Sequence, residues 1–349
     1  MSEMKAARFY DPGKPVKVEQ VSVPEIGPED ILVEVKACGI CGSDVHIIKG
    51  ETFTGKSPII LGHEGAGIVS SVGEAVVDWK AGDRVVIDCV TSCGNCFNCQ
   101  RGQDSICLSR QLTGIHLDGA LAQFIKVKPR NLIHLPPEID FETGSLATDA
   151  VATPYHALRA RAMLKSAEAV AIFGIGGLGF HALKIARLMG ATPIIAVDIS
   201  QAALERAKDA GADIVIDATK EDPPDRIRRL MADQLGTDVA LECVGHSRTV
   251  RWAAESVRPS GRAVIVGLSP ESIQLMGITE FVRGEISLIG SSAFEIKEIK
   301  EILSLMRSGR LDLGSSITKT VSLDEINEAL TALSENSGDY IRIVVNRFQ

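Results

Sequence analysis

The stretch Ala169-Val-Ala-Ile-Phe-Gly-Ile-Gly-Gly-Leu-Gly179 joins a continuous apolar run to a glycine-rich turn. Such a run is typical of a parallel strand that is buried on both faces. A helical pattern follows at 180–189, and a second apolar run ends at Asp198. A strand, a G-x-G-x-x-G turn, a helix and an acid about twenty residues later together predict a dinucleotide site in a doubly wound sheet.

Each glycine of this turn is expected to have a different structural role. Gly174 allows the tight turn, Gly176 lets the backbone approach a pyrophosphate, and Gly179 lets the helix pack closely on the strand. The helix N-terminus would then hold the phosphates. Asp198 would bind the adenosine ribose hydroxyls and repel a 2′-phosphate, and residues 199–201 bring no cation to neutralise one. The sequence therefore predicts NAD rather than NADP.

Strand and helix patterns continue to alternate after Asp198. This alternation requires right-handed crossovers and a parallel sheet. We therefore predict that residues 153–291 form a Rossmann domain. Its further strands are expected at 214–216, 239–245, 263–267 and 286–290, and its further helices at 202–210, 225–235 and 250–257.

The part of the chain before residue 145 has a different pattern. Short strand candidates separated by Gly and Pro turns predict a compact all-β body, a partly open barrel. A last strand at 340–345 is expected to return to this body, so the first domain would comprise 1–152 completed by 292–349. Amphipathic helices are expected at 297–308 and 323–333. The early strand candidates lie at 5–9, 16–18, 31–37, 65–73, 83–87, 120–127 and 131–135.

A mostly apolar helical pattern at 145–158 carries a single acid, Asp149. A carboxylate in an apolar helix is costly unless it is paired or ligates a metal. A helix cap or a solvated face explains Asp149 equally well on this local pattern.

Four cysteines give the most specific metal signal: Cys93, Cys96, Cys99 and Cys107. Three close thiols can wrap one ion from a single loop, and the fourth closes the tetrahedron. No ligand position stays open, so we expect a structural zinc. An iron–sulfur cluster is the lesser alternative, because the spacing differs from ferredoxin runs.

Cys41 and His63 are a second pair of candidate ligands, with the hydroxyl of Ser43 and the imidazole of His46 nearby in sequence. Thiolate and imidazole both suit zinc. A third protein ligand would leave one position open for a substrate, as in catalytic sites. Taken alone, the pair is better explained as a buried thiol and a core histidine.

Composition and charge exclude some kinds of binding partner for the protein. The chain has 349 residues and a net charge of −8, which argues against nucleic acid and anionic membranes. Residues 1–10 lack the apolar core of a secretory signal, and no apolar run is long enough to span a membrane. Eight cysteines are then more readily metal ligands than disulfides, and the expected setting is the reducing cytoplasm.

The ordered set of the Cys41–His46 segment, Gly62-His63-Glu64, the four-cysteine loop and the Gly174–Gly179 turn resembles the zinc-dependent medium-chain dehydrogenases, the alcohol dehydrogenase superfamily. The resemblance implies a GroES-like first domain, a structural zinc, and a catalytic zinc held by Cys41, His63 and a residue near 149. Many relatives have a second Cys there and some bacterial secondary-alcohol relatives have Asp, so Asp149 is the implied third ligand. Glu64 is implied as a transient ligand.

The resemblance also implies a mechanism. An alcohol would bind at the open zinc position between the two domains and give a hydride to NAD, while Ser43 passes the hydroxyl proton through the cofactor ribose to His46. Cys89 would line the substrate pocket. Further implied cofactor contacts are Gly177, Leu178 behind the nicotinamide ring, Val244, Gly267, and Arg342 at the pyrophosphate.

A secondary or cyclic alcohol, or the matching carbonyl compound, is the favoured small-molecule substrate. The close rival is a polyol or amino-alcohol dehydrogenase of the sorbitol or threonine type, although those relatives usually carry Glu near the third ligand position. The rival from another class is a non-catalytic NAD-binding protein. The resemblance favours a homotetramer, with a dimer as the alternative.

Overall fold

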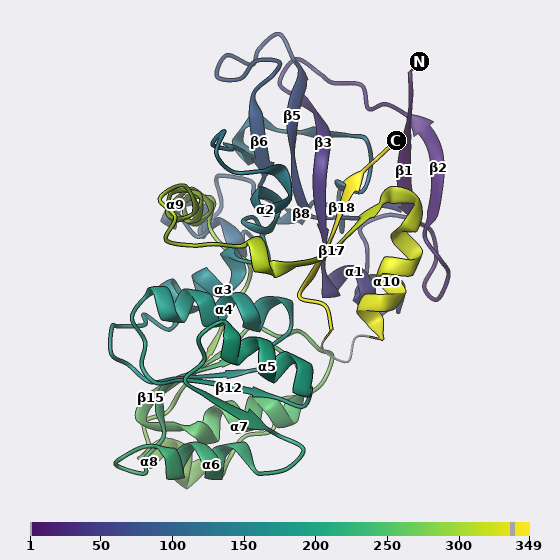
Figure 1. The fold of residues 1–349 in the computed structure, drawn as a ribbon. Coiled ribbons are helices and arrows are strands. Elements are labelled where there is room, and N and C mark those ends of the chain that lie inside the picture. Colours follow the sequence, from purple (N-terminus) through teal and green to yellow (C-terminus); the bar gives the residue numbers. More distant parts are fainter. Residues whose placement is uncertain (1, 336–338) are drawn as a thin grey trace. The chain divides into compact units, whose positions relative to one another are not determined.

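The computed structural model describes residues 2–335 and 339–349. Backbone proximity divides the chain into two compact units (Figure 1). Of the described residues, the first unit comprises 2–152, 293–335 and 342–349, and the second comprises 153–292 and 339–341. The segment 292–349, predicted to complete the first domain, includes residues 336–338, which lie outside the described residues.

The first unit is built on a seven-stranded sheet with the order β10-β6-β5-β3-β18-β17, in which β9 also pairs with β3. The C-terminal strand β18 pairs antiparallel with β3, so the predicted return of the chain end to this body is confirmed. Among the described residues no ladder joins β10 to β17, so the sheet stays open. Its strands are β3 (Ile31–Ile40), β5 (Glu64–Val72), β6 (Arg84–Ile87), β9 (Phe124–Val127), β10 (Leu132–His134), β17 (Ile317–Ser322) and β18 (Arg342–Arg347).

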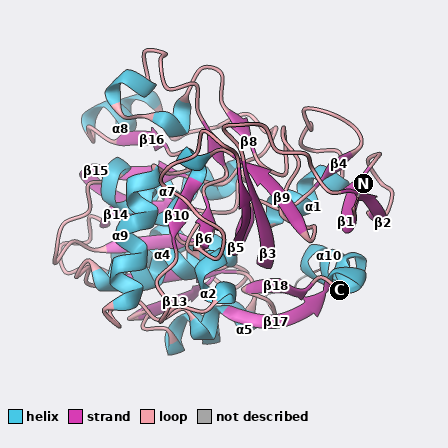
Figure 2. Ribbon diagram, turned by 90° about the horizontal axis from the view of Figure 1, so that it is seen from above, coloured by secondary structure: helices cyan, strands magenta, loops and turns pink. Residues whose placement is uncertain are grey.

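Two smaller sheets accompany the large one: β2-β1-β4 and the pair β7-β8. Helix α10 contacts β17 and β18 (Figure 2). The strands are β1 (Glu3–Phe9), β2 (Lys17–Ser22), β4 (Ile59–Ile60), β7 (Val90–Thr91) and β8 (Gln111–Leu112); the helices are α1 (Gly42–Ile48), α2 (Phe141–Leu146), α9 (Ile296–Arg307) and α10 (Ile326–Ser334).

The second unit contains a parallel six-stranded sheet with the order β13-β12-β11-β14-β15-β16. The strand order reverses between β11 and β14, as in a dinucleotide-binding Rossmann sheet. The predicted doubly wound fold is therefore confirmed. The strands are β11 (Val170–Phe173), β12 (Ile194–Asp198), β13 (Ile214–Asp217), β14 (Thr237–Glu242), β15 (Val257–Ile265) and β16 (Ser287–Gly290); the helices are α4 (Gly177–Leu188), α5 (Gln201–Asp209), α6 (Pro223–Leu230), α7 (Ser247–Ser256) and α8 (Ile278–Arg283).

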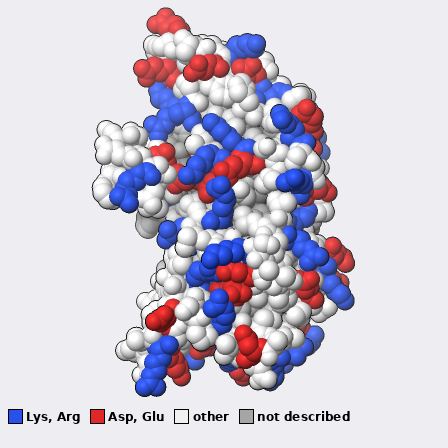
Figure 3. Space-filling model, turned by 90° about the vertical axis from the view of Figure 1, so that its left-hand side faces the viewer, with Lys and Arg blue, Asp and Glu red and all other residues white. Residues whose placement is uncertain are grey.

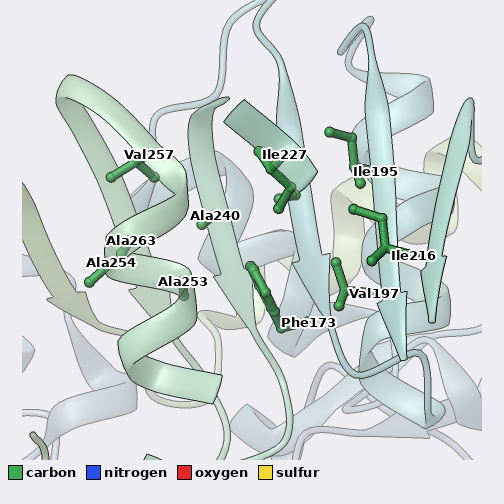
Figure 4. Packing of buried hydrophobic residues seen from close by; sticks show 11 residues of the cluster. Phe173, Ile195, Val197, Ile216, Ile227, Ala240, Ala253, Ala254, Val257 and Ala263 are labelled. Carbon is green, nitrogen blue, oxygen red and sulfur yellow. The ribbon is translucent and has the colours of Figure 1, made fainter. Parts of the chain in front are cut away.

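Apolar side chains of this sheet pack against α6 and α7 (Figure 4). Phe173, Val197 and Ile216 come from neighbouring strands, while Ile227 and Ala253 come from the helices, and all are at most 2% exposed. Burial of large apolar side chains stabilises a fold by about 1.5–3 kcal/mol each. This packing fixes β11, whose carboxyl end carries the glycine turn, and the strands beside it.

Two predicted helices are shorter than expected. The continuous helix expected at 145–158 is wrong: α2 ends at Leu146, and Asp149 lies in turn residues before α3 (Ala152–His156). A helix that continued from α2 would need the N–H of residue 154 to bind the carbonyl of Ala150, and Pro154 has none. Within α3, Pro154 lies in the first turn, where no such bond is required. The helix expected at 225–235 starts earlier, at Pro223, and ends at Leu230, since Met231 is extended.

Candidate active site and cofactor edge

The pairing of β3 with β5 brings Cys41 and His63 together. Gly39 lies opposite Glu64 in this ladder, so the residue after β3 and the residue before β5 emerge at the same place. Gly39 is also required there, because a Cβ atom would come within 2.0 Å of the Glu64 carboxylate. Cys41 and His63 are both buried, with exposures of 7% and 5%.

Asp149 joins this pair from the turn after α2. Its Oδ2 lies 3.7 Å from Cys41 Sγ and 3.5 Å from His63 Nε2. Ligand atoms of Cys41, His63, Glu64 and Asp149 all lie within 4.8 Å of one another. Tetrahedral zinc with bonds of about 2.0–2.3 Å separates its ligand atoms by about 3.3–3.8 Å. The cluster therefore fits one zinc ion, and thiolate, imidazole and carboxylate are all ligands that zinc accepts.

Glu64 has a partner that the sequence analysis missed. Arg342 Nη2 donates to Glu64 Oε1 at 2.8 Å and lies 3.5 Å from Cys41 Sγ. Arg342 is 2% exposed, on the strand that returns to β3. Burial raises the pKa of Glu64 to about 7, although the nearby guanidinium opposes the shift. The pyrophosphate contact expected for Arg342 stays a prediction; its partners within the first unit are Glu64 and Cys41.

Asp44 is a second residue that the sequence analysis missed. It is fully buried, and its Oδ2 accepts the N–H of Cys41 at 2.9 Å. Its Oδ1 lies 3.8 Å from His63 Nδ1, on the side of the imidazole away from Asp149. A carboxylate behind a ligating histidine orients the ring and raises its basicity. The signal for it was an acid within the first turn after a candidate ligand, which is common and therefore weak.

Candidate proton-transfer groups flank the cluster. Ser43 Oγ lies 3.3 Å from His63 Nε2. His46 is farther along α1, about half exposed, and its Nδ1 is hydrogen-bonded to the carboxylate of Glu51. This hydrogen bond lowers the pKa of Glu51. A hydroxyl beside the ligands and an imidazole open to solvent suit the two ends of a proton path.

The four-cysteine loop forms a second cluster. The Sγ atoms of Cys96 and Cys99 are 3.5 Å apart, and those of Cys93 and Cys99 are 3.9 Å apart, as are those of Cys96 and Cys107. These values match zinc held by four thiolates, with sulfur atoms about 3.8 Å apart. Glu295, just before α9, accepts the N–H groups of Asp104 and Ser105 and so ties this loop to the body.

The residues of the second unit that are expected to bind the cofactor lie at the carboxyl ends of its strands. Gly174 has φ +84°, and a Cβ atom on Gly179 would come within 1.8 Å of the Gly174 carbonyl oxygen. Asp198 ends β12, and its carboxylate accepts the N–H groups of Ile175, Ile199 and Ser200 at 2.6–2.8 Å. The acid is thus fixed against the glycine turn. Gly177 and Leu178 begin α4 in the same turn, and Val244 and Gly267 follow β14 and β15.

Family comparisons agree with this geometry. The model of the alcohol dehydrogenase GroES-like domain matches residues 27–137, and that of the zinc-binding dehydrogenases matches residues 177–308. An NAD-dependent alcohol dehydrogenase of Sulfurisphaera tokodaii is 32% identical, covering 95% of this chain and 96% of its own. A sorbitol dehydrogenase of Bacillus subtilis is 31% identical, covering 98% and 97%.

Structure comparison gives the same grouping. A protein from Sinorhizobium meliloti solved with NADP bound has a TM-score of 0.91 and 31% identity, covering 99% of this chain and 100% of its own. Similarity over nearly the whole chain, together with the two matching family models, places this chain among the zinc-dependent medium-chain dehydrogenases of the alcohol dehydrogenase superfamily.

Proposed function

We propose that this protein oxidises a secondary or cyclic alcohol with NAD as hydride acceptor and catalyses the reverse reduction of the carbonyl compound. The observation that carries the proposal is the cluster of Cys41, His63 and Asp149 with the Ser43 hydroxyl 3.3 Å from the imidazole. Three ligands and an adjacent proton acceptor are what alcohol oxidation on zinc requires.

The chain's own residues would divide the chemistry as follows. Bound zinc supplies a Lewis acid toward the alcohol oxygen, and bound NAD accepts the hydride. Ser43 would accept the hydroxyl proton, and the half-exposed His46 would deliver it to solvent, because an imidazole can accept a proton on one nitrogen and donate one from the other. The Asp44 carboxylate lies 3.8 Å from His63 Nδ1, too far for a hydrogen bond, and would act on the ring through its charge. Arg342 keeps the Glu64 carboxylate in place beside the ligands, where it can act as the transient ligand.

The substrate class rests on Cys89. This thiol is 5% exposed, and its pKa is raised well above the ordinary value, by burial first and by the charge of Asp149 second. The resemblance implies that Cys89 lines the substrate pocket. A thiol occupies less volume than an aromatic side chain, so it would leave room for a branched or cyclic alcohol. A polyol is the second candidate, favoured by the similarity to the sorbitol dehydrogenase.

A panel of primary, secondary, cyclic and polyhydroxy alcohols, followed by NADH absorbance, tests the proposal. Secondary or cyclic alcohols should give the highest kcat/KM. A preference for sorbitol-like substrates would support the polyol alternative. No turnover with any alcohol, in protein that contains zinc and binds NADH, would favour the non-catalytic alternative.

We also propose a preference for NAD, based on the Asp198 carboxylate beside the glycine turn. Replacement of Asp198 by Gly together with Ile199→Arg should raise the NADP/NAD ratio of kcat/KM by at least about tenfold, since it removes a repulsion and adds a cation. An unchanged ratio would remove Asp198 from this role.

The surface and the helix lengths bear on the partners and the assembly of the protein. On the face drawn in Figure 3, acidic and basic side chains are interspersed, which does not suit a nucleic-acid partner. In the part of the chain that the structure describes, no helix is long and apolar enough to cross a membrane. Strand β16 ends its sheet, and Ile278 and Val282 of α8 are exposed by 84% and 63%, as an oligomer interface would require. We propose a cytoplasmic homotetramer, which light scattering in solution would test against a dimer or monomer.

A further inference from the structure

Glu242 is a buried carboxylate at the edge of the parallel sheet where the strand order reverses. It is the last residue of β14 and is fully buried. In the sheet register it lies beside Phe173 on one side and Ile265 on the other. The turns that begin at Gly174, Cys243 and Val266 therefore leave the sheet next to one another.

The carboxylate of Glu242 holds the middle one of these three turns. Its Oε1 accepts the N–H groups of Val244 and Gly245, both at 2.8 Å. The hydroxyl of Thr249, in the first turn of α7, lies 2.7 Å from the same oxygen and 2.8 Å from the carbonyl oxygen of His246. Its single proton can serve only one of these acceptors at a time. Oε2 has no hydrogen-bond partner among the described residues.

The held turn packs directly on the glycine turn. A Cβ atom on Gly174 would lie 2.4 Å from Cγ2 of Val244. Gly245 has φ +85°, and a Cβ atom on Gly267 would lie 2.1 Å from the Gly245 nitrogen. The 243–245 turn therefore leaves no room for a side chain at Gly174 or at Gly267. A shift of residues 243–245 would displace the Gly174–Gly179 turn, which we propose binds the dinucleotide.

The same hydrogen bonds determine whether the backbone N–H groups of residues 244–245 are free to bind a ligand. Free backbone N–H groups at strand ends are ordinary binding sites for phosphate. Here the N–H groups of Val244 and Gly245 are directed to an internal carboxylate. The turn therefore presents the half-exposed side chain of Val244 rather than donors for an anion.

We propose that Glu242 is a positioning residue for the dinucleotide: it fixes the 243–245 turn against the glycine turn and thereby sets the affinity for the cofactor. This inference rests on the proposed function, because it assumes that the sheet edge binds NAD. Charge-assisted hydrogen bonds are roughly twice as strong as neutral ones. Removing the charge alone should loosen the turn without changing the size of the side chain.

The test measures NADH dissociation by fluorescence in the full-length, zinc-loaded protein. Glu242→Gln should raise the dissociation constant about tenfold, as expected when charge-assisted bonds are weakened. KM for NAD should rise similarly while kcat stays within about twofold, since the reacting groups are untouched. A dissociation constant within twofold of the unsubstituted protein would overturn the inference.

Asp238 provides the matched control. It lies near the other end of the same strand, where its carboxylate accepts the N–H of Ala169 at 2.8 Å and pairs with Arg258. Asp238→Asn should lower Tm but leave NADH binding unchanged. If both variants weaken NADH binding in proportion to their loss of Tm, the effect of Glu242 is general destabilisation and the inference fails.

Thr249 keeps the inference testable if Glu242→Gln does not fold. Thr249→Val removes one donor and should raise the NADH dissociation constant about threefold, and Thr249→Ser should restore it. Equal binding by Thr249→Val and Thr249→Ser would contradict the inference. The unsubstituted protein separates the two hypotheses: if it binds no NADH, the proposed function fails, whereas normal binding with unaffected variants refutes only the role of Glu242.

Discussion

The two cysteine-containing clusters of the first unit differ in how they are surrounded. Cys41 and His63, which are buried, and the partly exposed Asp149 form a mixed set with three kinds of donor atom, and a hydroxyl lies next to them. Cys93, Cys96, Cys99 and Cys107 form a uniform thiol set on a loop in which Cys93 is exposed. Both can hold zinc, and we expect the first, which has a hydroxyl beside its ligands, to be the one that acts on a substrate.

The two clusters also differ in the residues that contact their ligands. Buried acids and a cation surround the mixed cluster, with Asp44 behind His63 and Arg342 on Glu64. The thiol loop is held instead by backbone contacts and by Glu295 at the start of α9. Charged groups behind ligands tune reactivity, whereas backbone ties chiefly give order. We therefore expect substitutions at the first cluster to affect activity and those at the second to affect stability.

The largest expected effect is on activity at the mixed cluster. Cys41→Ala should lower kcat/KM for alcohol oxidation at least about a thousandfold, because the substrate oxygen loses its Lewis acid. Metal analysis should show one zinc per chain instead of two. Cys38→Ala is the matched control, since Cys38 is a buried thiol three residues earlier that belongs to neither cluster. Retention of more than a tenth of the activity by Cys41→Ala would contradict this role.

The next effect is on stability at the thiol loop. Cys96→Ser should release the second zinc and lower Tm by about 5–10 °C, because the loop loses the ion that orders it. Differential scanning calorimetry with metal analysis measures both. Loss of the zinc without any change in Tm would show that the ion does not contribute to the fold, and the contrast between the clusters would disappear.

A smaller effect concerns the buried acid Asp88, which precedes the thiol loop in the sequence. Burial raises its pKa to about 7, although the N–H of Val90 opposes the shift. Between about pH 4 and pH 7 the folded state holds a proton that the unfolded chain has lost, so this group makes stability fall as pH rises. Asp88→Asn should raise Tm by about 3–6 °C at pH 8 and much less at pH 4.5. Equal shifts at both pH values would contradict the assignment.

The smallest effect is expected at the end of the proton path. His46→Gln should slow alcohol oxidation about fivefold at pH 7 and below, and little at pH 9, where solvent base can accept the proton. The pH profile of kcat measures this. Glu51→Gln keeps the imidazole of His46 and removes only the charge of its partner. The pH profile of Glu51→Gln should therefore lie between those of His46→Gln and the unsubstituted protein. Parallel profiles for His46→Gln and the unsubstituted protein would exclude His46 from proton transfer.

Local chemistry made much of the molecule predictable. The turn at Gly174–Gly179 and the acid at Asp198 belong to one strand–helix–strand unit. They could be predicted from the sequence because glycine geometry and strand burial depend on residues that are close in the chain. The four-cysteine loop was predictable for the same reason, since its ligands lie within fifteen residues. Asp149 was not predictable from its local pattern, which left a helix cap equally open and suggested a helix that was wrong; only the family resemblance implied that it is a ligand.

The remaining parts of the site depend on strands that meet only after folding. Arg342 reaches Glu64 because β18 pairs with β3 across some three hundred residues of chain. Glu242 lies beside the glycine turn because β14 is placed next to β11 in the sheet. Short-range spacing and burial patterns in the amino-acid sequence were enough to predict the donor types and the two fold classes. Which buried charges stand behind those donors depends on long-range strand pairing, which leaves no periodic trace in the sequence.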